Sequence, residues 1–414
     1  MQHSGRTAPA ARRVVITGIG VAAPSGLGVA DFWAATRIGK NAIGPVTRFD
    51  ASSYPARLAG EVRGFEAGDH LPGRLVPQTD RVTQLALTAT DCALADAGIA
   101  PGDVHPYDMG VVTAAGSGGS EFGERELRKL WGQGAKHVSA YQSFAWFNAA
   151  NSGQISVRND LRGPTGVLVG DQAGGLDALA HARRRIRNGG RLIVTGGFDA
   201  SICSFGWAAH LAGGGVTATN DPERAYLPFD GAASGYVPGE GGAIVVLEDE
   251  GSVRARGGRN VYGEFAGYAA TFDPRPGSGR EPGLRRAVEG ALADAGCHRD
   301  EVDVVFADGA GVPGPDRVEA EAITAVFGPR GVPVTVPKTM TGRLGAGGAP
   351  VDVVSAVLAM REGLIPPTTN VELSPDYDID LVTGRSRTAS VRTALVLARG
   401  HGGFNSAAVL RAVD

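Results

Sequence analysis

Short apolar runs and amphipathic stretches alternate along almost the whole chain. The apolar runs have the length of buried strands, and the amphipathic stretches repeat apolar residues with the period of a helix that has one buried face. The runs predict strands over residues 13–21, 109–114, 192–197, 242–248, 302–307, 332–336, 393–398 and 407–411, and the amphipathic stretches predict helices over residues 80–97, 283–295 and 350–361. This alternation predicts an α/β fold with mostly parallel sheets in both halves of the chain.

One strand-to-helix turn, within residues 166–186, is distinguished by its chemistry. Residues 167–169 are predicted as a buried strand and the helical period begins at Leu176, so residues 170–175 form a sharp elbow. Such an elbow projects one side chain beside the free N–H groups of a helix N-terminus, where negative charge is stabilised and the pKa of a thiol falls. The projecting residue here is Gln172, and a carboxamide cannot act as a nucleophile. The pattern therefore predicts the geometry of an acyl-enzyme without its nucleophile.

The size of the chain predicts two lobes, because 414 residues exceed the usual size of one hydrophobic core. We expect a disordered leader at residues 1–11, a first lobe at 12–250 and a second lobe at 251–414, joined near a Gly-, Arg- and Ser-rich stretch at 250–260. A net charge of -3 without an evident basic stripe argues against nucleic acid or membrane as a partner. Since no run reaches membrane length and no signal-peptide core is present, we expect a cytoplasmic protein.

Neither the cysteines nor the first glycine pair indicates a cofactor or a metal. Cys92, Cys203 and Cys297 have no metal-binding or redox spacing and are expected as small core residues in a reducing compartment. Gly18 and Gly20 suggest a dinucleotide-binding loop, but its third glycine and its acidic residue about twenty positions on are missing. A tight turn between strand and helix is the favoured interpretation of this pair.

Three motifs resemble those of thiolase-fold β-ketoacyl synthases. They are the elbow, the segment 228–242 that begins Pro-Phe-Asp and ends Gly-Glu-Gly-Gly, and the closing Gly-Gly-Phe-Asn-Ser at 402–406. Within that superfamily, the elbow sequence Gln172-Ala-Gly-Gly-Leu-Asp-Ala178 resembles the chain-length factor, the ketosynthase-like second subunit of type II aromatic polyketide synthases. The resemblance runs almost end to end and implies an α/β, thiolase-like duplicated fold of five layers, αβαβα.

The resemblance also identifies the chemistry that has been lost. A decarboxylating ketosynthase uses a cysteine to carry the acyl chain and two histidines to stabilise the enolate of a malonyl thioester. Gln172 stands at the cysteine position, Asp308 and Arg343 stand at the two histidine positions, and Lys338 is retained. Because removing one member of such a set already costs several orders of magnitude, no condensation is expected on this chain. The sequence leaves open whether Asp308 and Arg343 form an ion pair.

Partners and product length follow from the same resemblance. It implies a heterodimer with a catalytic ketosynthase subunit and an acyl carrier protein whose phosphopantetheine delivers the substrates. Ser120, Gly123 and Leu127, at i, i+3 and i+7 of one predicted helix, match the face that lines the far end of the polyketide tunnel, and Phe205 is assigned to the same tunnel. Because these helix side chains are small, we expect a product longer than an octaketide, a decaketide to dodecaketide. The alternative is that these residues have no role in a tunnel and belong to a helix start that happens to be rich in Gly and Ser.

Two further alternatives remain at this stage. Phe144, Trp146 and Phe147 match a segment at the ketosynthase dimer interface, although ordinary aromatic core explains them equally well. For function, the predicted role is that of a chain-length factor in the acyltransferase family, silent by itself. The alternative is a malonyl-acyl carrier protein decarboxylase that supplies the starter unit through Gln172, since loading ketosynthases also carry glutamine at the elbow. Those enzymes keep both histidines, however, and this chain has neither.

Overall fold

The computed structural model describes residues 12–100, 102–275 and 277–413, so the predicted leader at 1–11 lies outside the described residues. Its main sheet consists of two halves with the same strand order. The first half runs β1-β8-β7-β5-β6 and the second β9-β16-β15-β10-β11, with β13 beyond β11. The bounds are β1 (Val14–Ala23), β5 (Met109–Ala114), β6 (Thr165–Leu168), β7 (Leu192–Asp199), β8 (Gly241–Asp249), β9 (Gly263–Phe272), β10 (Val304–Phe306), β11 (Pro333–Thr335), β13 (Asp380–Leu381), β15 (Thr393–Arg399) and β16 (Phe404–Arg411).

Within each half, one strand runs against the other four. That strand is β8 in the first half and β16 in the second. The prediction of mostly parallel sheets therefore holds for β5, β6 and β7 and for β10, β11 and β15, but the sheet as a whole is mixed. The halves meet where Val15 and Ile16 of β1 pair antiparallel with Glu264 and Gly263 of β9. The repeated strand order and this antiparallel junction are those of the duplicated thiolase-like fold.

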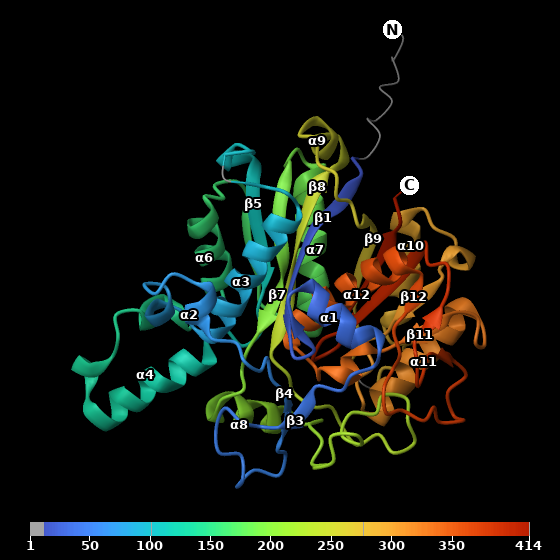
Figure 1. The fold of residues 1–414 in the computed structure, drawn as a ribbon. Helices are drawn as coiled ribbons and strands as arrows, with labels where there is room; N and C mark the ends of the chain where they lie inside the picture. Colours follow the sequence, from blue (N-terminus) through green and yellow to red (C-terminus); the bar gives the residue numbers. More distant parts are fainter. Residues whose placement is uncertain (1–11, 101, 276, 414) are drawn as a thin grey trace.

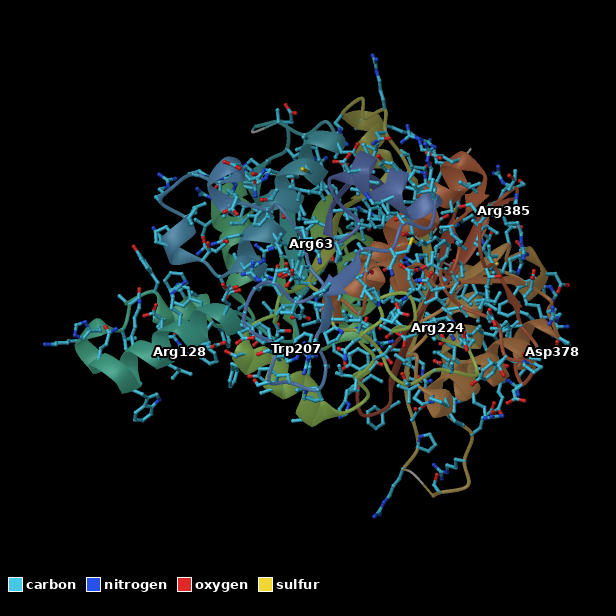
Figure 2. The ribbon with its side chains drawn as sticks, turned by 60° about the horizontal axis from the view of Figure 1, so that its bottom comes forward. Arg63, Arg128, Trp207, Arg224, Asp378 and Arg385 are labelled. Carbon is cyan, nitrogen blue, oxygen red and sulfur yellow. The ribbon has the colours of Figure 1, made fainter. Side chains whose placement is uncertain are left out.

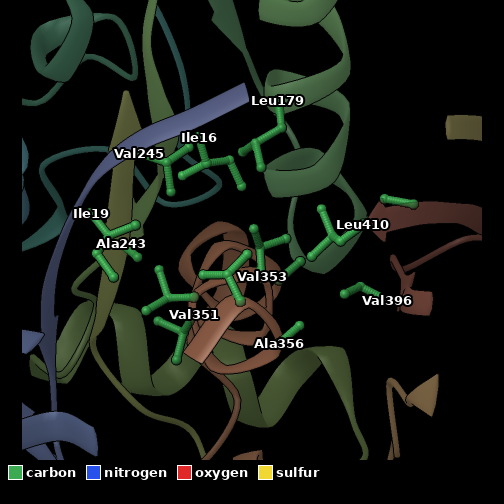
Figure 3. Packing of buried hydrophobic residues seen from close by; sticks show 14 of the residues in the cluster. Ile16, Ile19, Leu179, Ala243, Val245, Val351, Val353, Ala356, Val396 and Leu410 are labelled. Atoms are coloured by element: carbon green, nitrogen blue, oxygen red, sulfur yellow. The ribbon is translucent and has the colours of Figure 1, made fainter. Parts of the chain in front are cut away.

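Helices cover both faces of each half-sheet, which gives the five layers (Figure 1). Helices α3 (Arg81–Asp96) and α6 (Ala150–Asn159) cover the outside of the first half, and α10 (Leu284–Ala295) and α11 (Pro313–Phe327) cover the second. Helices α7 (Gln172–Arg187) and α12 (Gly348–Glu362) fill the middle layer. Figure 3 shows α12 end-on, with Val351 and Val353 among side chains from β1, β8 and α7. Apolar burial on both sides of the middle layer therefore holds the two halves together.

The remaining elements are short or lie at the periphery. Among the described residues, no helix is long and apolar enough to cross a membrane. Cys203 and Cys297 are buried as expected, whereas Cys92 is exposed because it lies on the outward side of α3.

The α-helices and strands not yet named are β2 (Gly26–Leu27), α1 (Val29–Arg37), β3 (Ile43–Pro45), β4 (Leu58–Gly60), α2 (Ala67–His70), α4 (Ser120–Gln133), α5 (Gln142–Ala145), α8 (Ser204–Gly213), α9 (Glu250–Ala255), β12 (Leu364–Ile365) and β14 (Arg387–Thr388).

Gly18 and Gly20 lie inside β1 and not in a turn, so the expected turn is wrong. A Cβ at Gly18 would lie 2.1 Å from the carbonyl oxygen of Ala93, and one at Gly20 would lie 1.9 Å from that of Ala89. Both carbonyls belong to α3. The glycines are required because α3 packs directly against the backbone of β1. Close packing, and not nucleotide binding, therefore explains this pair.

Strand β6 is an open edge, so the prediction of a buried strand at 167–169 is wrong. β6 pairs with β5 on one side and is the terminal strand of the sheet order. Val167 is 38% exposed and Val169, just beyond the strand, is 70% exposed. An apolar run has the same appearance whether the chain buries it or leaves it at an edge, and an uncovered apolar edge strand is a surface on which another chain can pair.

Candidate functional site

Gln172 is the first residue of α7, four residues before the expected start of the helix, and its side chain is 5% exposed. Oriented to satisfy its partners, the carboxamide donates to the carbonyl oxygen of Gly345 at 3.2 Å and accepts from its N–H at 3.1 Å. A Cβ at Gly348 would lie 2.5 Å from the same carboxamide. The residue at the nucleophile position is therefore packed against the loop before α12 and joined to its backbone.

Asp308 and Arg343 form a buried bidentate ion pair. Arg343 Nη1 lies 2.9 Å from Asp308 Oδ2, and Nη2 lies 3.2 Å from Oδ1. The guanidinium also donates to the carbonyl of Arg399, whose N–H donates back to Asp308 at 3.1 Å. Burial by itself would raise the pKa of Asp308, but the charges of Arg343 and Lys338 outweigh it and hold that pKa below its usual value. The structure thus answers the question that the sequence left open.

The loop that carries Arg343 is fixed by backbone contacts with a neighbouring segment. Arg343 N donates to the carbonyl of Val237 at 2.9 Å, and Gly239 N donates to the carbonyl of Arg343 at 2.8 Å. A Cβ at Gly60 would lie 1.8 Å from the carbonyl oxygen of Thr341. These contacts hold the guanidinium in position, with its Cζ atom 5.8 Å from the ring centroid of Tyr236.

Lys338, in the short helix Pro337–Met340, is also buried and paired. Its ammonium contacts the carboxylate of Asp352 on α12 and donates to the carbonyl of Ala307 at 2.9 Å. Burial raises the pKa of Asp352 to about 6, against the opposing effect of Lys338. Since Ala307 precedes Asp308, Lys338 ties the loop of the first replaced histidine to the middle layer of the fold.

Two acidic residues on α11 support the loop that follows β10. Glu319 accepts from the N–H groups of Asp308 and Gly309 at 2.7 and 2.8 Å, and Asp316 accepts from Gly311 N and Phe229 N, both at 3.1 Å. Burial, and then the charge of Asp308, raise the pKa of Glu319 to about 7. The sequence analysis missed both residues. They lie on the buried face of α11, a helix that was not predicted from the sequence.

The comparisons with known proteins agree with this geometry. Residues 11–251 match the family model "Beta-ketoacyl synthase, N-terminal domain", and residues 262–372 match "Beta-ketoacyl synthase, C-terminal domain". The chain is 60% identical over 399 residues to the Streptomyces coelicolor protein named as the second β-ketoacyl synthase of actinorhodin polyketide, covering 96% of this chain and 98% of that protein. It is 55% identical over 400 residues to the tetracenomycin polyketide synthase ketoacyl synthase beta subunit of Streptomyces glaucescens, with the same coverage.

The chain belongs to the chain-length-factor group of the β-ketoacyl synthase family. A solved structure titled as the ishigamide ketosynthase/chain length factor matches 98% of this chain and 100% of its own, with a TM-score of 0.87 and 29% identity. A type II polyketide synthase acyl carrier protein in complex with its ketosynthase bound to the hexaketide matches 97% of this chain and 100% of its own, with a TM-score of 0.86 and 26% identity. The chain is thus a β subunit of a type II polyketide synthase.

The chain-length factor carries its predicted tunnel residues on two neighbouring helices. Ser120, Gly123 and Leu127 lie on α4, which projects from the body of the molecule, and Phe205 lies at the start of α8 beside it (Figure 1). Glu124 joins the helices, because it accepts from Ser204 Oγ at 2.5 Å and from Phe205 N at 3.0 Å. The structure therefore brings all four residues to one region of the chain-length factor.

The side chains on this α4 face leave space. A Cβ at Gly123 would have one neighbour within 4 Å, Trp146 Cβ at 3.8 Å. Leu127 is 43% exposed and Phe205 is 59% exposed. Ser120 Oγ is engaged, since it donates to the carbonyl of Ser117 at 3.0 Å. A larger side chain at position 123 therefore fits without displacing backbone.

Two buried carboxylates that the sequence analysis missed fix the start of α4. Asp80 accepts from Val82 N at the start of α3 at 2.9 Å and from Phe122 N in the first turn of α4 at 2.7 Å. Asp199 accepts from Ser117 N at 2.8 Å, just before α4, and from Ala346 N at 2.7 Å, beside the loop that binds Gln172. The predicted tunnel helix and the replaced nucleophile are thus anchored to the same framework.

The aromatic segment before α6 is largely on the surface. Trp146 and Phe147 are 49% and 51% exposed, with ring centroids 5.9 Å apart, and Phe144 is half-buried beside Tyr141. This exposure is incompatible with the alternative of ordinary aromatic core for Trp146 and Phe147. Among the described residues, no group of three or more His, Cys, Asp or Glu side chains is placed to hold a metal ion.

Proposed function

We propose that this chain pairs with a catalytic ketosynthase and shapes the tunnel in which that subunit extends a poly-β-ketone on acyl carrier protein. One observation carries the proposal: every position of the lost catalytic set is occupied by a group already bound within the chain. Gln172 is bound to Gly345, Asp308 and Arg343 are bound to each other, and the retained Lys338 is bound to Asp352. A ketosynthase fold with a filled site has kept its shape and lost its condensation chemistry.

The surface supports a heterodimer. The open edge of β6, with exposed Val167 and Val169, and the exposed pair Trp146 and Phe147 are apolar groups that an isolated chain gains nothing by exposing. Aromatic side chains are enriched among the residues that contribute most to protein interfaces. The two structural relatives described above are titled as a ketosynthase/chain length factor and as a ketosynthase complex with acyl carrier protein.

The α4 face supports a product longer than an octaketide. A hydroxymethyl group, a bare backbone and a single leucine at positions 120, 123 and 127 leave more room than aromatic residues would. Since protein interiors are closely packed, the side chains that close a tunnel decide how many ketide units fit. We therefore keep the proposal of a decaketide to dodecaketide.

The geometry favours this role over malonyl-acyl carrier protein decarboxylation. Stabilising an enolate requires hydrogen-bond donors aimed at the developing negative charge. Both ends of the Gln172 carboxamide are paired with Gly345, and the donors of Arg343 are directed to Asp308 and to backbone carbonyls. Asp308 itself would repel an enolate.

Co-expression with the cognate ketosynthase and acyl carrier protein tests the proposal. We expect a stable heterodimer and polyketides whose formation requires both subunits, measured by mass spectrometry of the released products. A chain that stays separate from the ketosynthase, or that decarboxylates malonyl-acyl carrier protein without it, would overturn the proposal.

A further inference from the structure

Helix α7 lies in the middle layer, yet one side of it faces an open pocket. The pocket has a volume of about 450 Å³ and lies between β6, α7 and β9. Its wall includes Leu168 from β6, Tyr268 from β9 and, from the last turns of α7, Arg183, Arg184 and Arg187. These three arginines, which we call the basic stripe, give this region positive charge although the chain as a whole carries a net charge of -3.

The carboxylates near the basic stripe do not neutralise it. Arg183 donates to Asp294 at 2.6 Å, and Arg187 Nη1 lies 3.8 Å from the same carboxylate. Asp177, the acidic residue in the pocket wall, already accepts from the hydroxyl of Tyr268 at 2.6 Å and from Ser406. One carboxylate is thus shared by two arginines, and Arg184 adds a further charge.

The hydrogen bonds of the stripe are also incomplete. Arg183 is 6% exposed. Its Nη1 atom donates to Asp294, and its Nη2 atom donates to the carbonyl of Ala266. Within the described residues, the Nε atoms of Arg183 and Arg187 are buried and have no acceptor. A buried donor without an acceptor is costly, so these arginines are only partly satisfied within the chain.

The stripe adjoins the open edge of the sheet. Leu168 belongs both to β6 and to the pocket, and a Cβ at Gly166 of β6 would lie 3.7 Å from the ring of His181 on α7. Two edge strands that pair antiparallel are related by an axis perpendicular to the sheet, so the helices packed on the same face become neighbours. Pairing through β6 therefore brings α7 beside the corresponding helix of the other chain.

We infer that the basic stripe, through Arg184 and Arg187 at its exposed end, selects a partner chain whose corresponding helix carries carboxylates, and that it opposes pairing between two copies of this chain. The inference rests on the proposed heterodimer and adds the chemistry by which the partner is recognised. In a pair of identical chains the two stripes approach each other, and juxtaposed like charges oppose association. An acidic partner helix replaces this repulsion with attraction.

Charge reversal at the exposed end of the stripe tests the inference. In Arg184→Glu with Arg187→Glu, we expect the dissociation constant of the ketosynthase heterodimer to rise about ten-fold or more at low salt, with a smaller effect at high salt because surface charges are screened. The matched control is Arg254→Glu with Arg259→Glu, which makes the same charge change on and just after α9. It should leave the dissociation constant unchanged.

A second measurement separates the inference from a folding defect. Sedimentation of the charge-reversed chain mixed with unmodified chain should show a dimer that neither forms alone, since opposite charges then face each other. Heterodimer affinity equal to that of the unmodified chain, or no dimer in the mixture, would overturn the inference. Failure of the unmodified chain to bind the ketosynthase would instead overturn the proposed function.

Discussion

Arg343 and Asp308, the residues at the two positions where ketosynthases carry histidine, face each other across 2.9 and 3.2 Å in one buried ion pair. Neither side chain is free for substrate. The pair also closes the space between the loop after β10 and the loop before α12. The pair is therefore a structural contact between two loops of the second half.

Removing one partner of this pair should destabilise the protein strongly. Asp308→Ala leaves the Arg343 guanidinium buried without its counter-ion, and we expect a loss of about 3–5 kcal/mol in the free energy of unfolding. Asp308→Leu combined with Arg343→Met removes both charges and should cost clearly less than the single change. Urea denaturation of the purified heterodimer measures both.

The exposed pair Arg330–Asp378 provides the control for that comparison. Asp378 lies on the surface of the second half (Figure 2), and Asp378→Ala should change the free energy of unfolding by less than about 1 kcal/mol. Equal losses for Asp308→Ala and Asp378→Ala would contradict the structural role of the buried pair.

Stability should fall as the pH rises from about 4.5 through about 7. Burial, together with Asp308, raises the pKa of Glu319 to about 7, and burial raises those of Asp316 and Asp352 to about 6. A carboxyl with a raised pKa keeps its proton in the folded chain at pH values where the unfolded chain has lost it. Raising the pH through this range therefore favours the unfolded chain. Asp308, whose pKa is lowered in the folded chain, has the opposite effect: its contribution to stability is lost as the pH falls below about 4. Denaturation at several pH values should give a shallower slope for Glu319→Gln, and an unchanged slope would refute this assignment.

Restoring a thiol should not restore condensation. In Gln172→Cys the two positions where ketosynthases carry histidine still hold the Asp308–Arg343 ion pair, so the donors that stabilise an enolate remain absent. Intact-mass measurement after incubation with an acyl donor reports any acylation of the new cysteine, with Gln172→Ala as the control. Elongated product from the Gln172→Cys chain without its partner would contradict the account of the filled site.

Truncating the exposed aromatic pair should weaken the heterodimer. Trp146→Ala with Phe147→Ala removes two half-exposed rings, and interface aromatics of this kind typically contribute about 2 kcal/mol or more, so affinity should fall at least about thirty-fold. Ile38 is 69% exposed at the end of α1, and Ile38→Ala is the control that should bind as the unmodified chain does. Isothermal titration with the ketosynthase decides between these outcomes.

The alternation of strands and helices could be predicted from the sequence because it depends on local periodicity. The strand at residues 109–114 and the helix at 283–295 were predicted to within one residue. The edge character of β6 could not be predicted, since an apolar run looks the same in a covered strand and in an edge strand. The role of Gly18 and Gly20 was missed because the backbone of α3, which requires them, is more than sixty residues away.

The residues of the site could be located from the sequence, but their contacts could not. The family resemblance located Gln172, Asp308, Lys338 and Arg343, whereas their pairing depends on loops that the fold brings together. The support from Glu319 was missed because no helix was predicted over residues 313–327, although Glu319 lies on the buried face of α11.

The released polyketide from a heterodimer that carries Gly123→Phe tests the central claim most directly. A ring at position 123 extends from the α4 face into the space beside Trp146, and the folded complex should release a chain shortened by one or more ketide units. Gly132→Phe, at the exposed far end of the same helix, is the control and should leave the product unchanged. Mass spectrometry showing a shorter product only for Gly123→Phe would support the account, and an unchanged product mass from a folded, active Gly123→Phe complex would contradict it.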